Sequence, residues 1–174
     1  MDTEKFWSMI DEARQKGLGD ARKQRELLID ALCDLSPEHI QQFDRLLSTM
    51  MSRAYRADLW EAAWLVACGC GDDSFHDFRY WLIGQGQTIY EKVLEEPENL
   101  VDLVDGNQRL SIFDSWAANV AASAYERKTN QPLPEIGDVA KSVLIGSLVS
   151  EDEIPAKFPR IVAKLGDCTE VDFL

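Results

Sequence analysis

Apolar positions recur along most of the chain at spacings of three and four residues, the period of an amphipathic α-helix. The clearest run follows Ser36 and Pro37, two residues typical of a helix start. Its apolar positions share one face and are Ile40, Phe43, Leu46, Leu47, Met50 and Ala54. Residues 57–69 are apolar nearly all round, which is typical of a central, buried helix. We therefore expect an all-α protein, a single compact multi-helix domain of about seven to eight helices.

Capping residues and glycines divide the chain into these helices. Asp2 can cap the first helix and Asp20 the second, because a carboxylate there accepts a hydrogen bond from a free main-chain N–H group. Asp72, Asp73 or Ser74 can cap the helix that follows residue 71. Polar turn clusters of the kind that separate β-strands are missing, so nothing in the pattern predicts a sheet.

The second half of the chain is less regular. Residues 112–130 predict one long helix that Asn130 ends. Residues 139–149, VAKSVLIGSLV, fit the periods of both a helix and a strand. Residues 150–153, SEDE, match a capping box, and residues 158–166, FPRIVAKLG, predict a last short helix.

Net charge restricts the range of possible binding partners more than overall composition does. The 174 residues are 45 % hydrophobic and 28 % charged, which is ordinary for a globular protein. The 18 Lys and Arg residues face 31 Asp and Glu residues, a net charge of −13, and residues 57–174 alone hold 9 basic and 21 acidic side chains. Such a field repels phosphate backbones, so nucleic acid is not expected as a partner, whereas a basic protein would be attracted.

The acidic half of the chain suggests an interaction surface for such a partner. Its candidate carboxylates lie in two stretches and are Glu91, Glu95, Glu96, Glu98, Asp102, Asp105, Glu151, Asp152 and Glu153. We call these residues the acidic surface. If they are spread evenly over the molecule, their acidity serves solubility instead.

The remaining totals predict a cytoplasmic protein with no membrane association. No apolar run approaches the roughly 18 residues that span a bilayer, and the first residues lack the basic and apolar blocks of a signal peptide. The cysteines are then reduced thiols; they are Cys33, Cys68, Cys70 and Cys168. We expect no cofactor.

Residues 68–86, CGCGDDSFHDFRYWLIGQG, concentrate chemically active side chains. Cys68, Cys70 and His76 could supply metal ligands, but structural zinc sites usually use two cysteine pairs with wider spacing. Cys70 and His76 also nominally suit a hydrolase, although both expected histidine positions lie on helix surfaces. We favour a turn between two helices, no metal site and a protein that is not an enzyme.

Arg79 in the same stretch leaves two interpretations open. It lies between Phe78 and Tyr80, so its guanidinium is expected to be partly buried and to need a carboxylate partner. The first interpretation is a structural network of ion pairs and helix caps. The alternative is a polar pocket for a small ligand or a catalytic site, which requires a cavity where these groups converge. The residues for either are Arg53, Arg56, Asp58, Asp72, Asp73, Arg79 and Tyr80.

Three stretches of the chain resemble a known bacterial family. The central one, residues 56–86, joins a Trp-containing helix to a motif formed by Asp72, Asp73, Phe75, Phe78, Arg79, Trp81, Leu82, Ile83 and Gly86. The others are residues 4–14, EKFWSMIDEAR, and residues 122–134, ASAYERKTNQPLP. Together they are similar to the bacterial family catalogued as domain of unknown function 4240, with weaker similarity to about residue 166.

The resemblance implies a bacterial cytosolic helical domain and transfers no catalytic residue, because the family has no settled activity. We expect a single domain over residues 1–174, with a family-like core at 4–134 and a further segment at 135–174. The function expected first is a non-enzymatic acidic protein-interaction module, a regulator or an immunity-type binder of a basic protein. The alternative is a small-ligand-binding protein or enzyme built around Asp72, Asp73 and Arg79.

Overall fold

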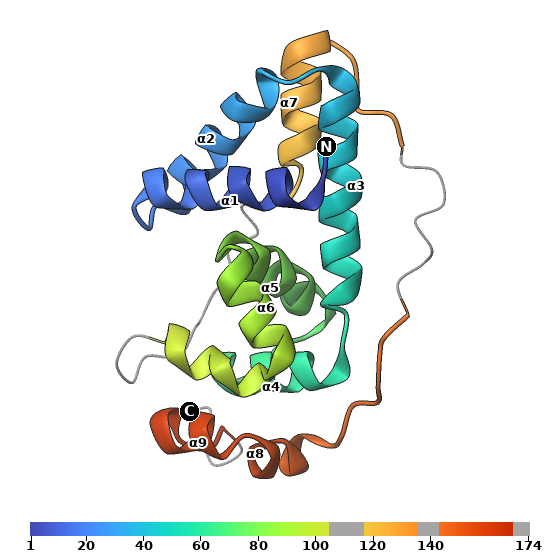
Figure 1. Ribbon diagram of the computed structural model, residues 1–174. Helices are drawn as coiled ribbons and strands as arrows, with labels where there is room; N and C mark the ends of the chain where they lie inside the picture. The colour runs from blue at the N-terminus through green and yellow to red at the C-terminus, as the bar shows by residue number, and fades with distance from the viewer. Residues whose placement is uncertain (105–116, 136–142, 169–174) are drawn as a thin grey trace, which may run out of the picture.

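The computed structural model describes residues 1–104, 117–135 and 143–168, and its helices build two packed groups (Figure 1). Within these residues there are nine α-helices, two 3₁₀ helices and no strand, which confirms the all-α class. The count exceeds the expected seven to eight because the C-terminal part contributes several very short helices. Their bounds are α1 Thr3–Gly17, α2 Ala21–Cys33, α3 Pro37–Arg53, α4 Ala57–Ala67, α5 Asp72–Gly84, α6 Gln87–Glu95, η1 Pro97–Leu103, α7 Val120–Thr129, η2 Glu151–Glu153, α8 Ile154–Lys157 and α9 Pro159–Leu165.

The first group consists of α1, α2 and α7 packed around the N-terminal half of α3 (Figure 1). The apolar stripe of α1 supplies Phe6 and Trp7, which are almost fully buried. The ring of Phe6 lies 4.8 Å from the ring of Phe43 on α3, measured between centroids. The stripes expected from helical periodicity therefore meet in the core.

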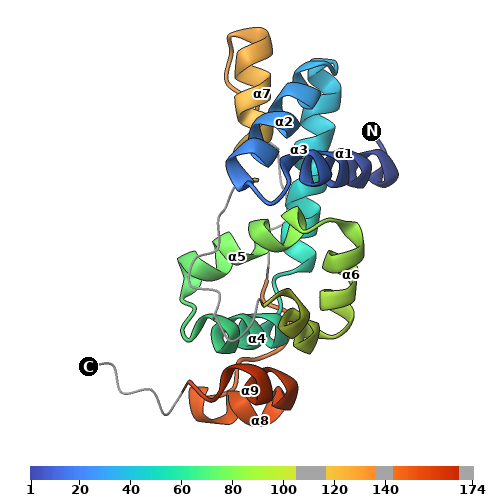
Figure 2. The same cartoon turned by 90° about the vertical axis from the view of Figure 1, so that its left-hand side faces the viewer.

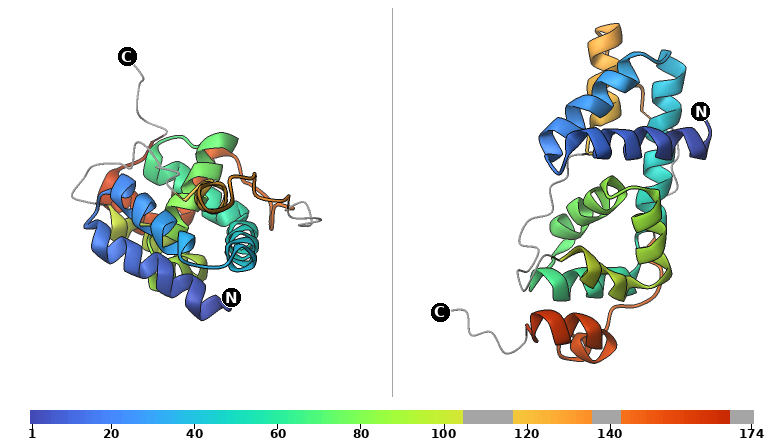
Figure 3. Two further views of the ribbon diagram at one scale, coloured as in Figure 1. Left: turned by 90° about the horizontal axis from the view of Figure 1, so that it is seen from above. Right: turned by 60° about the vertical axis from the view of Figure 1, so that its left-hand side comes forward.

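The second group consists of α4, α5, α6 and η1, with α8 and α9 beyond them. The long helix α3 extends from the first group to the second (Figure 3), and α7 and α9 lie at opposite ends of the molecule (Figure 2). As its sequence predicts, α4 is central: Ala62, Ala63, Leu65 and Val66 are fully buried. The buried apolar residues of both groups form one cluster that runs from Phe6 to Cys168.

The turn between α4 and α5 differs from the expected one in its caps. α4 ends at Cys68, which adopts a left-handed conformation with φ of 59°, before Gly69. The N-cap of α5 is Gly71, not Asp72, Asp73 or Ser74. Both aspartates therefore lie within the first turn, where their charge still favours the positive end of the helix dipole.

The helix expected over residues 112–130 is shorter than its pattern suggests. Residues 112–116 lie outside the described part, and residues 117–119 form a turn. Asn119 is left-handed with φ of 59°, so regular helical bonding starts only with α7 at Val120. A left-handed residue breaks the helix because its main chain leaves the helical path.

The C-terminal part resolves the ambiguous apolar run. Residues 139–142 lie outside the described residues, and residues 143–149 contain no helix and no named strand. Ile145 forms an isolated bridge to the α3–α4 connection: its N–H donates to the Tyr55 carbonyl at 3.0 Å, and its carbonyl accepts from Ala57 at 2.9 Å. The capping box of Ser150 and Glu153 and the last short helix α9 are confirmed. No helix in the described part is long and apolar enough to cross a membrane.

Candidate functional site

Two cavities contain five of the seven residues expected for the ion-pair network or polar pocket. The Arg56 cavity, about 810 Å³, lies between the α3–α4 connection, α6 and the C-terminal segment, and Arg53, Arg56 and Asp58 line it. The Arg79 cavity, about 400 Å³, lies between the end of α3 and α5. Arg79 and Tyr80 line it, whereas Asp72 and Asp73 line neither cavity.

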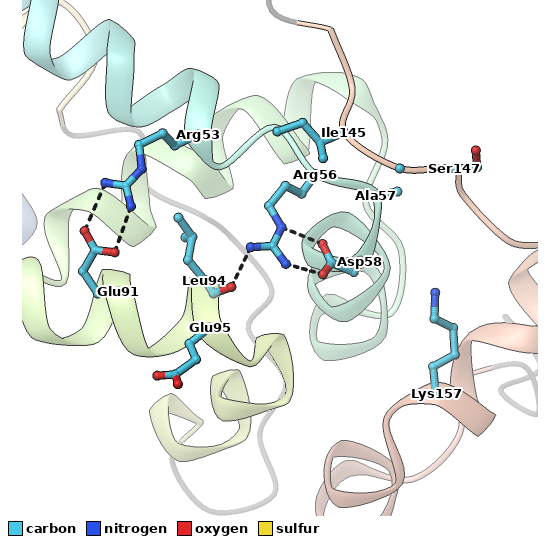
Figure 4. A pocket seen from close by; sticks show the side chains of 11 residues that line it. Arg53, Arg56, Ala57, Asp58, Glu91, Leu94, Glu95, Ile145, Ser147 and Lys157 are labelled. Atoms are coloured by element: carbon cyan, nitrogen blue, oxygen red, sulfur yellow. Dashed lines mark hydrogen bonds and ion pairs between the residues drawn. The ribbon is translucent and has the colours of Figure 1, made fainter.

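The two arginines of the Arg56 cavity are paired with acceptors in its walls (Figure 4). Arg53 donates to both carboxylate oxygens of Glu91, at 3.1 and 3.0 Å. Arg56 donates from Nε to Asp58 at 3.0 Å and from Nη1 to the Leu94 carbonyl at 2.6 Å. The contacts of Arg53 with Glu91 and of Arg56 with Leu94 hold α6 against the end of α3 and the α3–α4 connection. The arginines that line the cavity therefore belong to a structural network of ion pairs and hydrogen bonds.

That pairing also determines what the Arg56 cavity can do chemically. Asp58 is not the partner of Arg79: it binds Arg56 and also accepts from the N–H of Leu59 at 2.8 Å. The hydrogen bond from Arg53 to Glu91 raises the pKa of that arginine, so it stays charged. The paired carboxylates are occupied as hydrogen-bond acceptors, which does not suit a general base.

The residues around the α4–α5 turn do not converge into a site. Asp72 and Asp73 are exposed, and neither forms an ion pair with a described residue. Cys70 is buried, and burial raises the pKa of its thiol to about 12, which keeps it protonated and unreactive at neutral pH. Among the residues that the structure describes, no three His, Cys, Asp or Glu side chains form a group that could hold a metal ion.

Arg79 is the most unusual charged residue of the two cavities. Only 8 % of its surface is exposed, and Nη1 donates to the Met51 carbonyl at 3.1 Å and Nε to the Phe75 carbonyl at 3.4 Å. Its guanidinium lies 4.7 Å from the ring centroid of Tyr55. No carboxylate of a described residue forms an ion pair with it, and burial lowers its pKa.

The acidic surface is only partly free. Four of its members are engaged within the molecule: Glu91 with Arg53, Glu98 with the Arg160 N–H, Asp102 with Lys92 and Arg160, and Glu153 with Ser150. Four others are exposed and form no ion pair with a described residue: Glu95, Glu96, Glu151 and Asp152. Asp105 lies outside the described residues.

Sequence reasoning missed several residues in and near these cavities, among them Glu61, the partner of Lys157 in the wall of the Arg56 cavity. Glu61 is 1 % exposed; it accepts from the Val149 N–H at 2.9 Å and pairs with Lys157. Its place in the middle of the apolar run of residues 57–69, one helical turn after Asp58, is the signal that could have found it, since buried carboxylates need partners. Ser48 and Tyr55 of the Arg79 cavity carry no comparable signal, because they come from the amphipathic helix α3 and its end.

Comparison with known proteins gives a family and no activity. The family described as "Protein of unknown function (DUF4240)" matches residues 1–127, from α1 to within α7. The weaker similarity expected to about residue 166 is not part of this match. No curated protein and no solved structure matches the chain. Because the match spans well over half of the 174 residues, the chain belongs to the DUF4240 family of proteins of unknown function.

Proposed function

We propose that the protein is a non-enzymatic binding module for a basic protein, as a regulator or an immunity-type inhibitor is. One observation carries the proposal: after residue 56 each described cation has a carboxylate or a main-chain carbonyl of the same chain as its partner, whereas many carboxylates form no ion pair with a described residue. A surface of that kind presents an uncompensated negative field to solvent.

The cations of this part of the chain have two kinds of partner. Four pair with carboxylates: Lys92 and Arg160 with Asp102, Arg127 with Glu26 and Asp30, and Lys157 with Glu61. Three donate to main-chain carbonyls: Arg79 to Met51, Lys128 to Cys33, and Lys164 to Val101 and Val104. The four carboxylate pairs are locally neutral, whereas the three cations bound to carbonyls keep their charge and are outnumbered by the exposed acids that form no ion pair with a described residue.

The unpaired carboxylates lie on α5, at the end of α6 and on η2. Those that are exposed and form no ion pair with a described residue include Asp72, Asp73, Glu95, Glu96, Glu151 and Asp152. Complementary charge speeds the encounter with a basic partner and disfavours acidic ones. The paired walls of the Arg56 cavity support binding over catalysis, since both of its arginines already have carboxylate partners.

Capture from a lysate of the source cells tests this function. The wild type is compared with Glu95→Lys/Glu96→Lys and with a matched control, Glu4→Lys/Asp34→Lys, which reverses two exposed acids in the first group of helices. The wild type and the control should retain a basic protein at about 50 mM salt and release it at about 300 mM, because salt screens exposed charges. The acidic-surface variant should lose it at both.

Two outcomes would contradict the proposal. One is equal capture by the wild type and Glu95→Lys/Glu96→Lys, which would place the binding surface elsewhere. The other is that the wild type retains no basic protein at about 50 mM salt, where charge attraction is strong. Circular dichroism of both variants confirms beforehand that the helices are intact.

A further inference from the structure

The Arg79 cavity has features that the structural ion pairs of the Arg56 cavity lack. Its volume of about 400 Å³ lies within the range of small-molecule pockets. Its polar wall consists of Ser48, Ser52, Tyr55, His76, Arg79 and Tyr80. We propose that this cavity binds a small molecule through an anionic oxygen group, a carboxylate or a phosphate.

The first argument is the charge of Arg79, which lacks a counter-ion among the described residues. The guanidinium of a residue that is only 8 % exposed is costly without a carboxylate, because carbonyl dipoles replace only part of its hydration. Of its five N–H donors, Nη1 and Nε serve the Met51 and Phe75 carbonyls. Nη2 forms no hydrogen bond to a described residue, so Arg79 retains donors for an anion.

The second argument is that Arg79 is held in place before any ligand arrives. Its guanidinium lies 4.7 Å from the ring centroid of Tyr55 and 5.3 Å from that of Phe75. Together with the two carbonyl contacts, these rings fix the plane of the group, and a fixed donor loses little entropy on binding. Arginine suits such a site because its planar fork matches the geometry of carboxylates and phosphates.

The third argument concerns the neutral donors around the cavity. The hydroxyls of Ser48, Tyr55 and Tyr80 form no hydrogen bond to a described residue and are available to anionic oxygens. Two acids are close to one of them: Asp44 and Asp77 act with burial to raise the pKa of Tyr80. Neither acid lines the cavity or pairs with Arg79.

Titration with inorganic phosphate and with benzoate, each to about 10 mM at low ionic strength, tests the proposal. Binding is followed by NMR on the side-chain N–H signals of Arg79 and by the melting temperature, which rises with occupancy. The wild type should saturate with at least one probe. The probe that binds more tightly identifies the group, phosphate or carboxylate, that the site prefers.

Variants separate the cavity from nonspecific anion binding. Arg79→Gln should weaken binding about tenfold or more, since it removes the charged donor. Tyr80→Phe and Ser48→Ala should each weaken it a few-fold. The control Arg53→Gln, in the Arg56 cavity, should bind as the wild type does.

Two results would overturn the proposal that the Arg79 cavity binds an anionic group. Absence of saturation with both probes overturns the proposal, as does binding that is unchanged in Arg79→Gln. If Arg79→Gln does not fold, Tyr80→Phe and Ser48→Ala carry the test, and wild-type affinity in both overturns it. The result is independent of the acidic surface, because Glu95→Lys/Glu96→Lys should leave probe binding intact apart from a small gain from its higher charge.

Discussion

At the scale of single residues, Asp11 and Gly86 form a contact between α1 and the start of α6. The N-cap of α6 is Gly86, which has no side chain to offer. The carboxylate of Asp11 instead lies at the start of α6, beside Gly86, where burial raises its pKa and the main chain of Gln87 opposes that rise. Gly86 has φ of 89°, and a Cβ there would clash with Oδ1 of Asp11. A helix start is thus capped by a residue of another helix, and glycine permits the approach.

Gly86→Ala should therefore lower the free energy of unfolding by about 2–4 kcal/mol, from left-handed strain together with the clash. Asp11→Ala should cost about 1 kcal/mol, the loss of a cap. The double variant should cost less than the two single effects added, because the clash disappears with the Asp11 carboxylate. Urea unfolding measures all three.

Gly71→Ala provides the control for this cycle. No atom lies within 4 Å of a Cβ at Gly71, and its φ is −77°. It should cost less than about 1 kcal/mol, the loss of a glycine N-cap. Strict additivity of Asp11→Ala and Gly86→Ala would show that the two residues do not interact.

Arg79 shows which features of a single residue can be predicted from the sequence. Its flanking aromatic residues predict a buried guanidinium, and the structure places it 8 % exposed. The sequence does not reveal its actual neighbours, because the Met51 carbonyl comes from α3 and the Tyr55 ring from the α3–α4 connection. Local pattern indicates burial well, whereas it carries little information on which distant main-chain groups a side chain meets.

At the scale of elements, the C-terminal segment is fastened to α4 and η1 by a few buried and polar anchors. Ile154, Phe158 and Ile161 supply the apolar part. Glu61 of α4 supplies a polar part by binding Lys157 and the Val149 N–H. Because the carboxylate is buried, it depends on these partners.

Lys157→Met should destabilise this attachment by about 3 kcal/mol, since it leaves the buried Glu61 charge without its cation. Glu61→Gln combined with Lys157→Met should recover part of the loss by removing that charge. Hydrogen exchange followed by mass spectrometry should show faster exchange in residues 143–165 of Lys157→Met, with residues 3–53 unchanged.

The exposed pair of Lys92 and Asp102 supplies the comparison. Lys92→Met should change stability by less than about 1 kcal/mol, because surface ion pairs contribute little. If Lys157→Met were equally mild and its exchange pattern matched the wild type, Glu61 would not anchor the segment.

Helix starts are predictable from the sequence where capping and periodicity agree over many residues. α3 begins with Ser36 as N-cap and Pro37 at its first position, as expected. The conformation of residues 143–149 is not predictable in this way, because it depends on Tyr55 and Ala57, about ninety positions away. The family match gives no help there, since it ends at residue 127.

At the scale of the whole molecule, repulsion among exposed carboxylates destabilises the folded protein. The net charge is −13, and the described cations after residue 56 are engaged within the fold. Exposed carboxylates such as Glu95 and Glu96 therefore repel one another in the folded protein more than in the expanded chain. Salt weakens that repulsion over distances of about 10 Å at 0.1 M.

The melting temperature should accordingly rise by a few degrees as NaCl increases from about 10 to about 150 mM, where roughly 1 kcal/mol corresponds to 2–4 °C for a chain of this size. Screening also weakens the surface ion pairs, but exposed pairs contribute little. Glu95→Lys/Glu96→Lys changes the net charge from −13 to −9 and should show a smaller rise. Scanning calorimetry of both proteins measures the difference. A melting temperature that falls with NaCl would mean that attraction within the ion pairs outweighs repulsion among the free carboxylates, and the negative field would then be weaker than the proposed binding function requires.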